Sequence, residues 1–213
     1  MDNLAKKTAE YLLQIKAIKL QPSNPFTWAS GWKSPIYCDN RKTLSFPGVR
    51  SFIRDAFSEI VINRYPHAGL IAGVATGAIA HGVLVAEKLG LPFVYVRSGA
   101  KEHGLGNQIE GYFEQGQKVV IIEDLISTGG SSLGAFKALK EAGCDVLGMA
   151  AIFTYEFRKA ADAFGAAACE LQTLSNYSTL IAAASESGYI NEKDVDTLKL
   201  WRTDPENWGK NKL

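Results

Sequence analysis

The chain has 213 residues, of which 46% are hydrophobic and 21% are charged. These proportions are typical of globular proteins, so we expect one α/β domain with a sizeable core over residues 1–213. Lys and Arg number 23 against 22 Asp and Glu, which gives a formal net charge of +1. This balance argues against a nucleic-acid or membrane partner that binds through bulk charge.

The three cysteines, Cys38, Cys144 and Cys169, are far apart and lack Cys-x-x-Cys spacing. Disulfide bonds and a structural zinc site are therefore not expected. Residues 1–7 lack the apolar core of a signal peptide, and the sequence has no run of 18 apolar residues. We expect a cytoplasmic protein.

Apolar periodicity predicts an amphipathic helix over residues 4–18 and a second helix over residues 48–65. The segment between them is rich in Pro, Ser and aromatic residues, a composition that predicts turns and short strands. A βαβ rhythm follows, with strands expected over 70–74, 92–96, 118–122 and 146–153. Helices are expected over 76–89, 133–142, 157–164, 177–185 and 191–201. The pattern predicts a mostly parallel sheet flanked by helices, with residues 1–47 and the C-terminal residues as a small hood.

The most informative segment is residues 119–132, where an apolar run precedes an acidic pair and a turn of small residues. The apolar run predicts a buried strand that ends at Glu123 and Asp124. Ligands of α/β sheets bind beyond the carboxyl ends of strands, where the next helix offers unpaired N–H groups to anions. The turn adds hydroxyl donors, whereas the carboxylates suit sugar hydroxyls or a hydrated Mg²⁺. The segment therefore predicts a site for a phosphorylated sugar.

The alternative is an ordinary β-turn-α connection with an acidic helix cap, but a cap needs only one carboxylate. The segment resembles the phosphoribosyl-pyrophosphate (PRPP) signature of the type I phosphoribosyltransferases. That resemblance implies the fold of this family, with Glu123 and Asp124 on the ribose hydroxyls and residues 127–131 on the 5′-phosphate. The PRPP contacts that it implies in this segment are Glu123, Asp124, Leu125, Ile126, Ser127, Thr128, Gly129, Gly130 and Ser131. Residues 72–77 resemble the family's pyrophosphate loop, which adds Thr76.

A second functional segment is expected over residues 97–111, which are polar, rich in glycine and without periodicity. Loops of this length in compact domains are commonly functional. Arg97, Lys101 and His103 supply three potential cations that suit a pyrophosphate leaving group, and the glycines would let the loop close as a lid. The alternative is a solvated hairpin with incidental charges.

Together with Ile109-Glu110-Gly111, this segment resembles the catalytic loop of the orotate phosphoribosyltransferases. In that family the loop reaches PRPP in the neighbouring subunit of a homodimer. The resemblance therefore implies a homodimer that shares the loop, with catalytic roles for Arg97, Lys101, His103 and Asp124. One departure is Ser98, because many relatives have a second lysine at that position.

Residues 26–41 resemble the segment of that family that lines the pyrimidine pocket, where Tyr37 would stack on the base. Without the resemblance, the simplest interpretation is a segment that covers the core. Ser127 is the best side-chain match for a further orotate contact. Some relatives have Lys in place of Ala29 or Thr76, and Arg near Tyr155, so the sequence leaves the cation for orotate unassigned.

The resemblance implies an enzyme that converts orotate and PRPP to orotidine 5′-monophosphate and pyrophosphate, a step of pyrimidine (UMP) biosynthesis. Mg²⁺ is the expected cofactor, held mainly by substrate oxygens and water rather than by protein ligands. Two alternatives stay open: a phosphoribosyltransferase for a purine base, and a regulatory protein that binds PRPP without catalysis. The basic loop and the absence of a concentrated basic patch disfavour the second.

Overall fold

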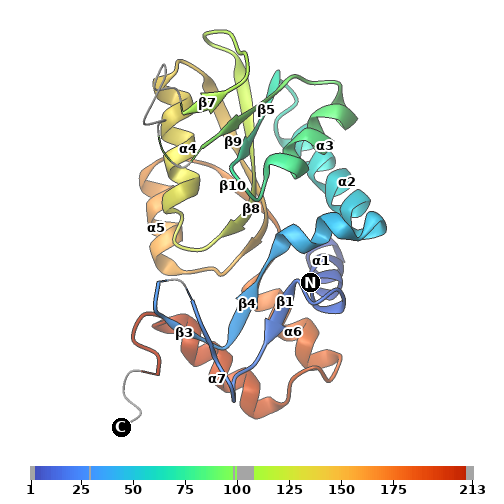
Figure 1. Cartoon of the computed structure of the whole chain (residues 1–213), viewed down its shortest axis with the longest axis vertical. Helices are drawn as coiled ribbons and strands as arrows, with labels where there is room; N and C mark the ends of the chain where they lie inside the picture. Colours follow the sequence, from blue (N-terminus) through green and yellow to red (C-terminus); the bar gives the residue numbers. More distant parts are fainter. Residues whose placement is uncertain (1–2, 29, 98, 100–107, 210–213) are drawn as a thin grey trace.

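A six-stranded sheet forms the centre of the computed structural model, which describes residues 3–28, 30–97, 99 and 108–209 (Figure 1). Its strand order is β10-β9-β8-β5-β6-β7, and every neighbouring pair is parallel except β6 and β7. The bounds are β5 (Leu70–Val74), β6 (Phe93–Val96), β7 (Ile109–Glu110), β8 (Lys118–Ile126), β9 (Asp145–Thr154) and β10 (Leu171–Asn176). The predicted α/β fold with a mostly parallel sheet is confirmed.

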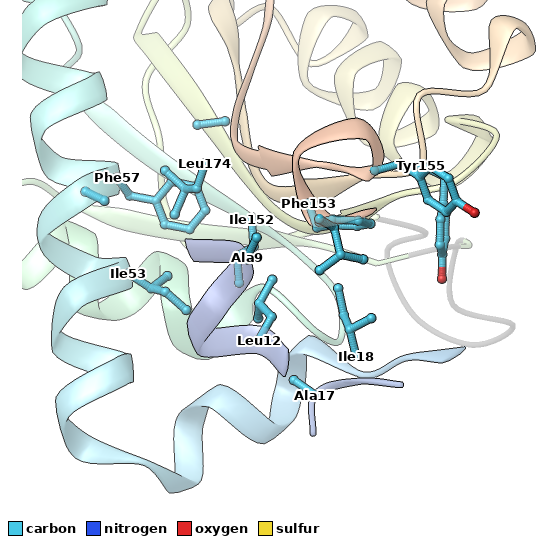
Figure 2. Close-up of a cluster of buried hydrophobic side chains, with 14 of the residues drawn as sticks. Ala9, Leu12, Ala17, Ile18, Ile53, Phe57, Ile152, Phe153, Tyr155 and Leu174 are labelled. Atoms are coloured by element: carbon cyan, nitrogen blue, oxygen red, sulfur yellow. The ribbon is translucent and has the colours of Figure 1, made fainter. Parts of the chain in front are cut away.

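Helices cover both faces of this sheet, as parallel strands buried on both sides require (Figure 1). The helices α2 (Pro47–Arg64) and α3 (Ile79–Leu89) pack on one face, and α4 (Gly130–Glu141) and α5 (Arg158–Ala166) pack on the other. Figure 2 shows the core on the first face, where Phe57 of α2, Ile152 of β9 and Leu174 of β10 belong to one cluster of buried side chains. Within the described residues, no helix is both long and apolar enough to cross a bilayer.

The N-terminal and C-terminal segments pack together beside the sheet, and residues 3–47 with α6 (Tyr177–Glu186) and α7 (Glu192–Thr203) are called the hood below (Figure 1). The helix α1 (Asn3–Gln14) packs against α6, and the Nζ of Lys6 lies 2.6 Å from a carboxylate oxygen of Glu186. The remaining elements are β1 (Ile18–Leu20), β2 (Phe26–Thr27), β3 (Lys33–Ser34), β4 (Ile36–Cys38) and the 3₁₀ helix η1 (Asn40–Ser45). Antiparallel pairing joins β1 to β4 and β2 to β3.

The structure differs from the sequence prediction most usefully at β8, which continues to Ile126 rather than ending before the acidic pair. Pairing with β9 sustains the extra residues, because Leu125 lies opposite Phe153 and Ile126 opposite Thr154. The acidic pair therefore lies on a strand and not in a turn.

The edge strand β10 was not predicted from the sequence. Its residues Leu-Gln-Thr-Leu-Ser-Asn have little apolar pattern, and their conformation depends on hydrogen bonds with β9.

Candidate functional site

The carboxyl ends of β5 and β8 leave an open space that holds most of the predicted site. Pairing between β5 and β8 ends at Gly73 and Ile122, whereas β8 continues beside β9. Residues 123–126 therefore have no β5 partner on their other side. A cavity of about 310 Å³ lies at this point. Its lining residues are Val74, Ala75, Thr76, Gly77, Glu123, Asp124, Leu125, Ser127, Thr128, Gly129, Gly130, Ser131 and Ser132.

Two loops meet the acidic pair across this cavity. On the β5 side, a Cβ atom on Gly77 would overlap the carboxylate of Asp124, so only glycine permits this close approach. On the other side, Gly129 has a φ of 84° and leads into α4, whose first amides lack intrahelical acceptors. A helix start of this kind favours anions, so the cavity joins an anion site to a carboxylate.

The buried Glu123 fixes the shape of the acidic pair rather than standing free in the cavity. Its side chain is 4% exposed. One carboxyl oxygen accepts from the backbone N–H of Asp124 at 2.9 Å, and the other accepts from the hydroxyl of Ser132 at 2.8 Å. Burial, and then the charge of Asp124, raise the pKa of Glu123 to about 8. Glu123 therefore ties β8 to the first turn of α4, and Asp124 is the carboxylate on the open side.

The raised pKa of Glu123 predicts a pH-dependent stability that Glu123→Gln removes. Folding raises this pKa from 4.5 to about 8, so the folded protein binds the carboxyl proton more tightly than the unfolded chain does. The stability that proton binding adds is therefore full below the unfolded pKa and is lost as the pH rises through about 8. Glutamine imitates the protonated carboxyl at every pH: its carbonyl oxygen can accept from the backbone N–H of Asp124, and its NH2 group can donate to the hydroxyl oxygen of Ser132. The variant should match the wild-type stability near pH 5 and exceed it by roughly a few kcal/mol near pH 9. Urea unfolding at both pH values measures the difference.

The exposed Glu141 on α4 offers a matched control for that measurement, because its carboxylate lies 3.6 Å from the Nζ of Lys137 in a solvent-exposed ion pair. Glu141→Gln should shift the free energy of unfolding by a similar small amount at both pH values. A stability difference between Glu123→Gln and the wild type that stays constant from pH 5 to pH 9 would contradict the assigned cause.

A buried hydrogen-bond network anchors the acidic pair to the hood. The Nδ2 of Asn40 donates to the backbone carbonyl of Asp124, and the hydroxyl of Thr43 donates to the carbonyl of Asn40. Because that hydroxyl hydrogen is engaged, the Nε2–H of His81 donates to Thr43 across 3.1 Å. Burial lowers the pKa of His81 to about 4, so the ring is neutral. Residues of η1 and α3 thus hold the backbone at Asp124 in one position.

A second cavity of about 240 Å³ adjoins the first and shares Leu125 and Ser127 with it. The hood supplies much of its wall, and the indole N–H of Trp28 is held by the carbonyl of Ile36 at 3.0 Å. Its lining residues are Thr27, Trp28, Tyr37, Cys38, Leu125, Ser127 and Tyr155. The aromatic walls suit a planar ring.

The two ends of the predicted catalytic loop are hydrogen-bonded to each other next to residues 72–77, the segment that resembles the pyrophosphate loop. The N–H of Arg97 donates to the carbonyl of Gln108, and the side-chain amide of Gln108 donates back to the carbonyl of Arg97, both at 2.9 Å. The preceding carbonyl, of Val96, accepts from Ala75 at 2.8 Å. The loop therefore begins and ends beside the first cavity. Lys101 and His103 lie outside the described residues, as do Ser98 and Ala29.

Most of the residues predicted for the site are brought together, but two are placed differently. Ile126 is fully buried in the core, and its carbonyl accepts from the N–H of Tyr155. Arg97 does not line either cavity, and its guanidinium lies 3.6 Å from Glu110. Within the described part of the chain, no three His, Cys, Asp or Glu side chains form a group that could hold a metal ion.

Comparison with known proteins identifies the family. Residues 44–177 match the phosphoribosyl transferase domain family. The chain is 60% identical over 208 residues to the orotate phosphoribosyltransferase of Phocaeicola vulgatus, and the match covers 98% of each chain. The chain belongs to the orotate phosphoribosyltransferase family.

Further relatives of this family agree with that assignment. The orotate phosphoribosyltransferase of Bacillus caldolyticus is 58% identical over 201 residues, which cover 94% of this chain and 97% of the relative. The crystal structure of the orotate phosphoribosyltransferase from Aeropyrum pernix superimposes with a TM-score of 0.74, at 24% identity, over 86% of this chain and 99% of that one. At that identity the superposition supports the fold of the family.

In this member of the orotate phosphoribosyltransferase family, several residues that were not predicted from the sequence also line the two cavities. Gly77 and Ser132 line the first cavity, and Trp28 and Tyr155 line the second. Gly77 and Ser132 are the last residues of the two marked segments, 72–77 and 119–132, so their position in the motifs could have suggested them. Trp28 and Tyr155 lie far apart in the sequence, and only the packing of the hood against β9 brings them together.

Proposed function

We propose that this chain transfers the phosphoribosyl group of PRPP to orotate and releases orotidine 5′-monophosphate and pyrophosphate. The observation that carries the proposal is the pair of joined cavities: one has an acidic pair facing a glycine-rich helix start, and the other has aromatic walls. The first cavity suits a sugar phosphate, and the second suits a planar base. The family membership of the chain supports the same reaction.

In the proposed complex, the amides and hydroxyls of residues 127–131 bind the 5′-phosphate at the start of α4. Asp124 accepts hydrogen bonds from the ribose hydroxyls, because its carboxylate lies on the open side of the pair. Glu123 holds Asp124 and Ser132 in place and contributes its carboxyl to the same wall. Tyr37 and Ser127 contact the orotate ring from the second cavity.

In this proposal, pyrophosphate binds between the loop that contains Thr76 and the catalytic loop expected over residues 97–111. A ring nitrogen of orotate forms the new bond to the anomeric carbon while the bond from that carbon to the pyrophosphate oxygen breaks. The sugar passes through an oxocarbenium-like state, as at other glycosidic carbons. Catalysis rests on positioning and on charge neutralisation by Arg97, Lys101 and His103, which the partner subunit of a homodimer supplies.

Mg²⁺ is the cofactor of the proposed reaction, and it neutralises pyrophosphate charge when bound. The residues at the cavity suit that ion, because the carboxylate of Asp124 could hold a water bound to it, while substrate oxygens and water would be its main ligands. The enzyme acts in the cytoplasm, in pyrimidine biosynthesis.

The proposed function is tested by following orotate absorbance with purified protein, PRPP and Mg²⁺, with adenine, hypoxanthine and uracil in parallel reactions. Loss of orotate that requires both PRPP and Mg²⁺ is the expected result. Turnover of a purine in place of orotate would keep the PRPP site and overturn the base assignment. PRPP binding without turnover of any base would instead favour a regulatory protein.

A further inference from the structure

Tyr155 is held rigidly at the junction of the sheet, the hood and the second cavity. Its side chain is 2% exposed. The ring stacks on Phe157 with centroids 5.3 Å apart, and it contacts Trp28 at 5.2 Å and Trp201 at 5.8 Å. Figure 2 shows Tyr155 at the edge of the buried cluster, next to Phe153. These contacts fix the ring, so the position of its hydroxyl is fixed as well.

The hydroxyl of Tyr155 makes no hydrogen bond to any residue that the structure describes, whereas two polar groups near it are paired. The nearby Tyr177 donates its hydroxyl to the carbonyl of Leu198 at 2.9 Å, and Trp28 donates its indole N–H to Ile36. Buried hydroxyl groups are normally paired, because an unpaired one loses its hydrogen bonds to water. An unpaired, rigidly held hydroxyl is therefore available to a ligand that can reach it.

The hydroxyl also has access to the second cavity. Among the described residues, the side-chain atoms that are both sealed from solvent and unpaired belong to Tyr65, His81 and Trp201, and the oxygen of Tyr155 is not one of them. Since Tyr155 lines the 240 Å³ cavity, this space is where its oxygen meets solvent. Burial raises the pKa of Tyr155 well above its usual range, so the hydroxyl remains a hydrogen-bond donor.

We propose that the hydroxyl of Tyr155 donates a hydrogen bond to an exocyclic oxygen of the bound pyrimidine and thereby helps to determine base specificity. This inference rests on the proposed function. Orotate has carbonyl and carboxylate oxygens at its ring edge, and both accept hydrogen bonds. A neutral donor held in an aromatic wall suits such an oxygen while the ring itself packs against the aromatic side chains. Adenine has no exocyclic oxygen, so this donor favours the oxygen-bearing base.

The test is Tyr155→Phe, which removes the oxygen and keeps the ring. We expect the KM for orotate to rise by about tenfold or more, because a hydrogen bond to the base is lost. The KM for PRPP and the melting temperature should change little, since the ring contacts remain and no hydrogen bond within the described structure is lost. A KM for orotate within twofold of the wild type would overturn the inference.

Two matched tyrosines separate this role from a structural one. Tyr177→Phe, in the same aromatic cluster, loses the bond to Leu198 and should lower the melting temperature without raising the KM for orotate. Tyr65→Phe removes a sealed, unpaired hydroxyl away from both cavities and should leave the KM unchanged. An equal rise in KM for Tyr177→Phe would show a general packing effect and overturn the inference.

The wild-type protein distinguishes failure of this inference from failure of the proposed function. Wild-type turnover of orotate with an unchanged Tyr155→Phe variant overturns only the role of Tyr155. Absence of wild-type turnover of orotate, with turnover of adenine, overturns the proposed function and the role of Tyr155 together.

Discussion

Replacing Gly77 by alanine is expected to lower kcat/KM for PRPP by about 100-fold while the melting temperature stays within a few degrees. A Cβ atom at this position would overlap the Asp124 carboxylate, so the carboxylate must rotate away from its place in the cavity. Rotation of one short side chain costs little stability, because nothing in the core has to move. The displaced carboxylate no longer meets the ribose hydroxyls, and misplacement by about 1 Å is enough to cost 10²-fold in rate. Steady-state kinetics and thermal unfolding measure the two quantities.

Gly134 in α4 provides the matched control, because a Cβ atom there meets nothing within 4 Å and the residue does not line the cavity. Gly134→Ala should keep full activity and gain a little stability from the higher helix propensity of alanine. Activity of Gly77→Ala equal to that of Gly134→Ala would show that the position of the Asp124 carboxylate is not critical.

Replacing Lys101 by alanine is expected to lower kcat by about 10²–10³, by analogy with the loss of a charge-stabilising donor. In the sequence, Lys101 falls between Arg97 and Gln108, whose backbones are joined by reciprocal hydrogen bonds. The proposed function assigns to Lys101 the neutralisation of the charge that develops on the leaving pyrophosphate. Lys137→Ala, an exposed lysine on α4, is the control and should remain within about twofold of the wild type. Near-normal turnover of Lys101→Ala would remove Lys101 from the mechanism.

Mixing the Lys101→Ala and Gly77→Ala proteins tests the proposal that the catalytic loop acts across a homodimer. If each loop serves the partner's site, a mixed dimer contains one site with an intact Gly77 and an intact Lys101, and activity returns. If each loop serves its own subunit, both sites in the mixed dimer carry one defect, and activity stays low. Subunit exchange followed by the orotate assay gives the answer, and low activity despite verified exchange would contradict the shared loop.

The sequence by itself determined the fold class and one of the two cavities. The strands of a parallel sheet are buried on both faces and are therefore continuously apolar. The apolar runs at residues 70–74 and 119–122 can thus be recognised as strands before their neighbours in the sheet are known. The acidic pair and the glycine-rich turn are adjacent in sequence, and a strand followed by a helix start brings adjacent residues to one site. Local pattern was therefore sufficient for the predicted PRPP contacts of residues 123–131, all of which line the first cavity except the buried Ile126.

Only the tertiary structure decided which residues from distant segments meet. The approach of Gly77 to Asp124 depends on β5 and β8 being neighbours, the bond from Asn40 to Asp124 depends on how η1 packs, and the contact of Trp28 with Tyr155 depends on the hood. The end of β8 depended on β9 in the same way. Hydrogen bonds and packing between segments far apart in the chain leave no periodic signature in either segment, so local sequence predicts the parts of this site but not their contacts.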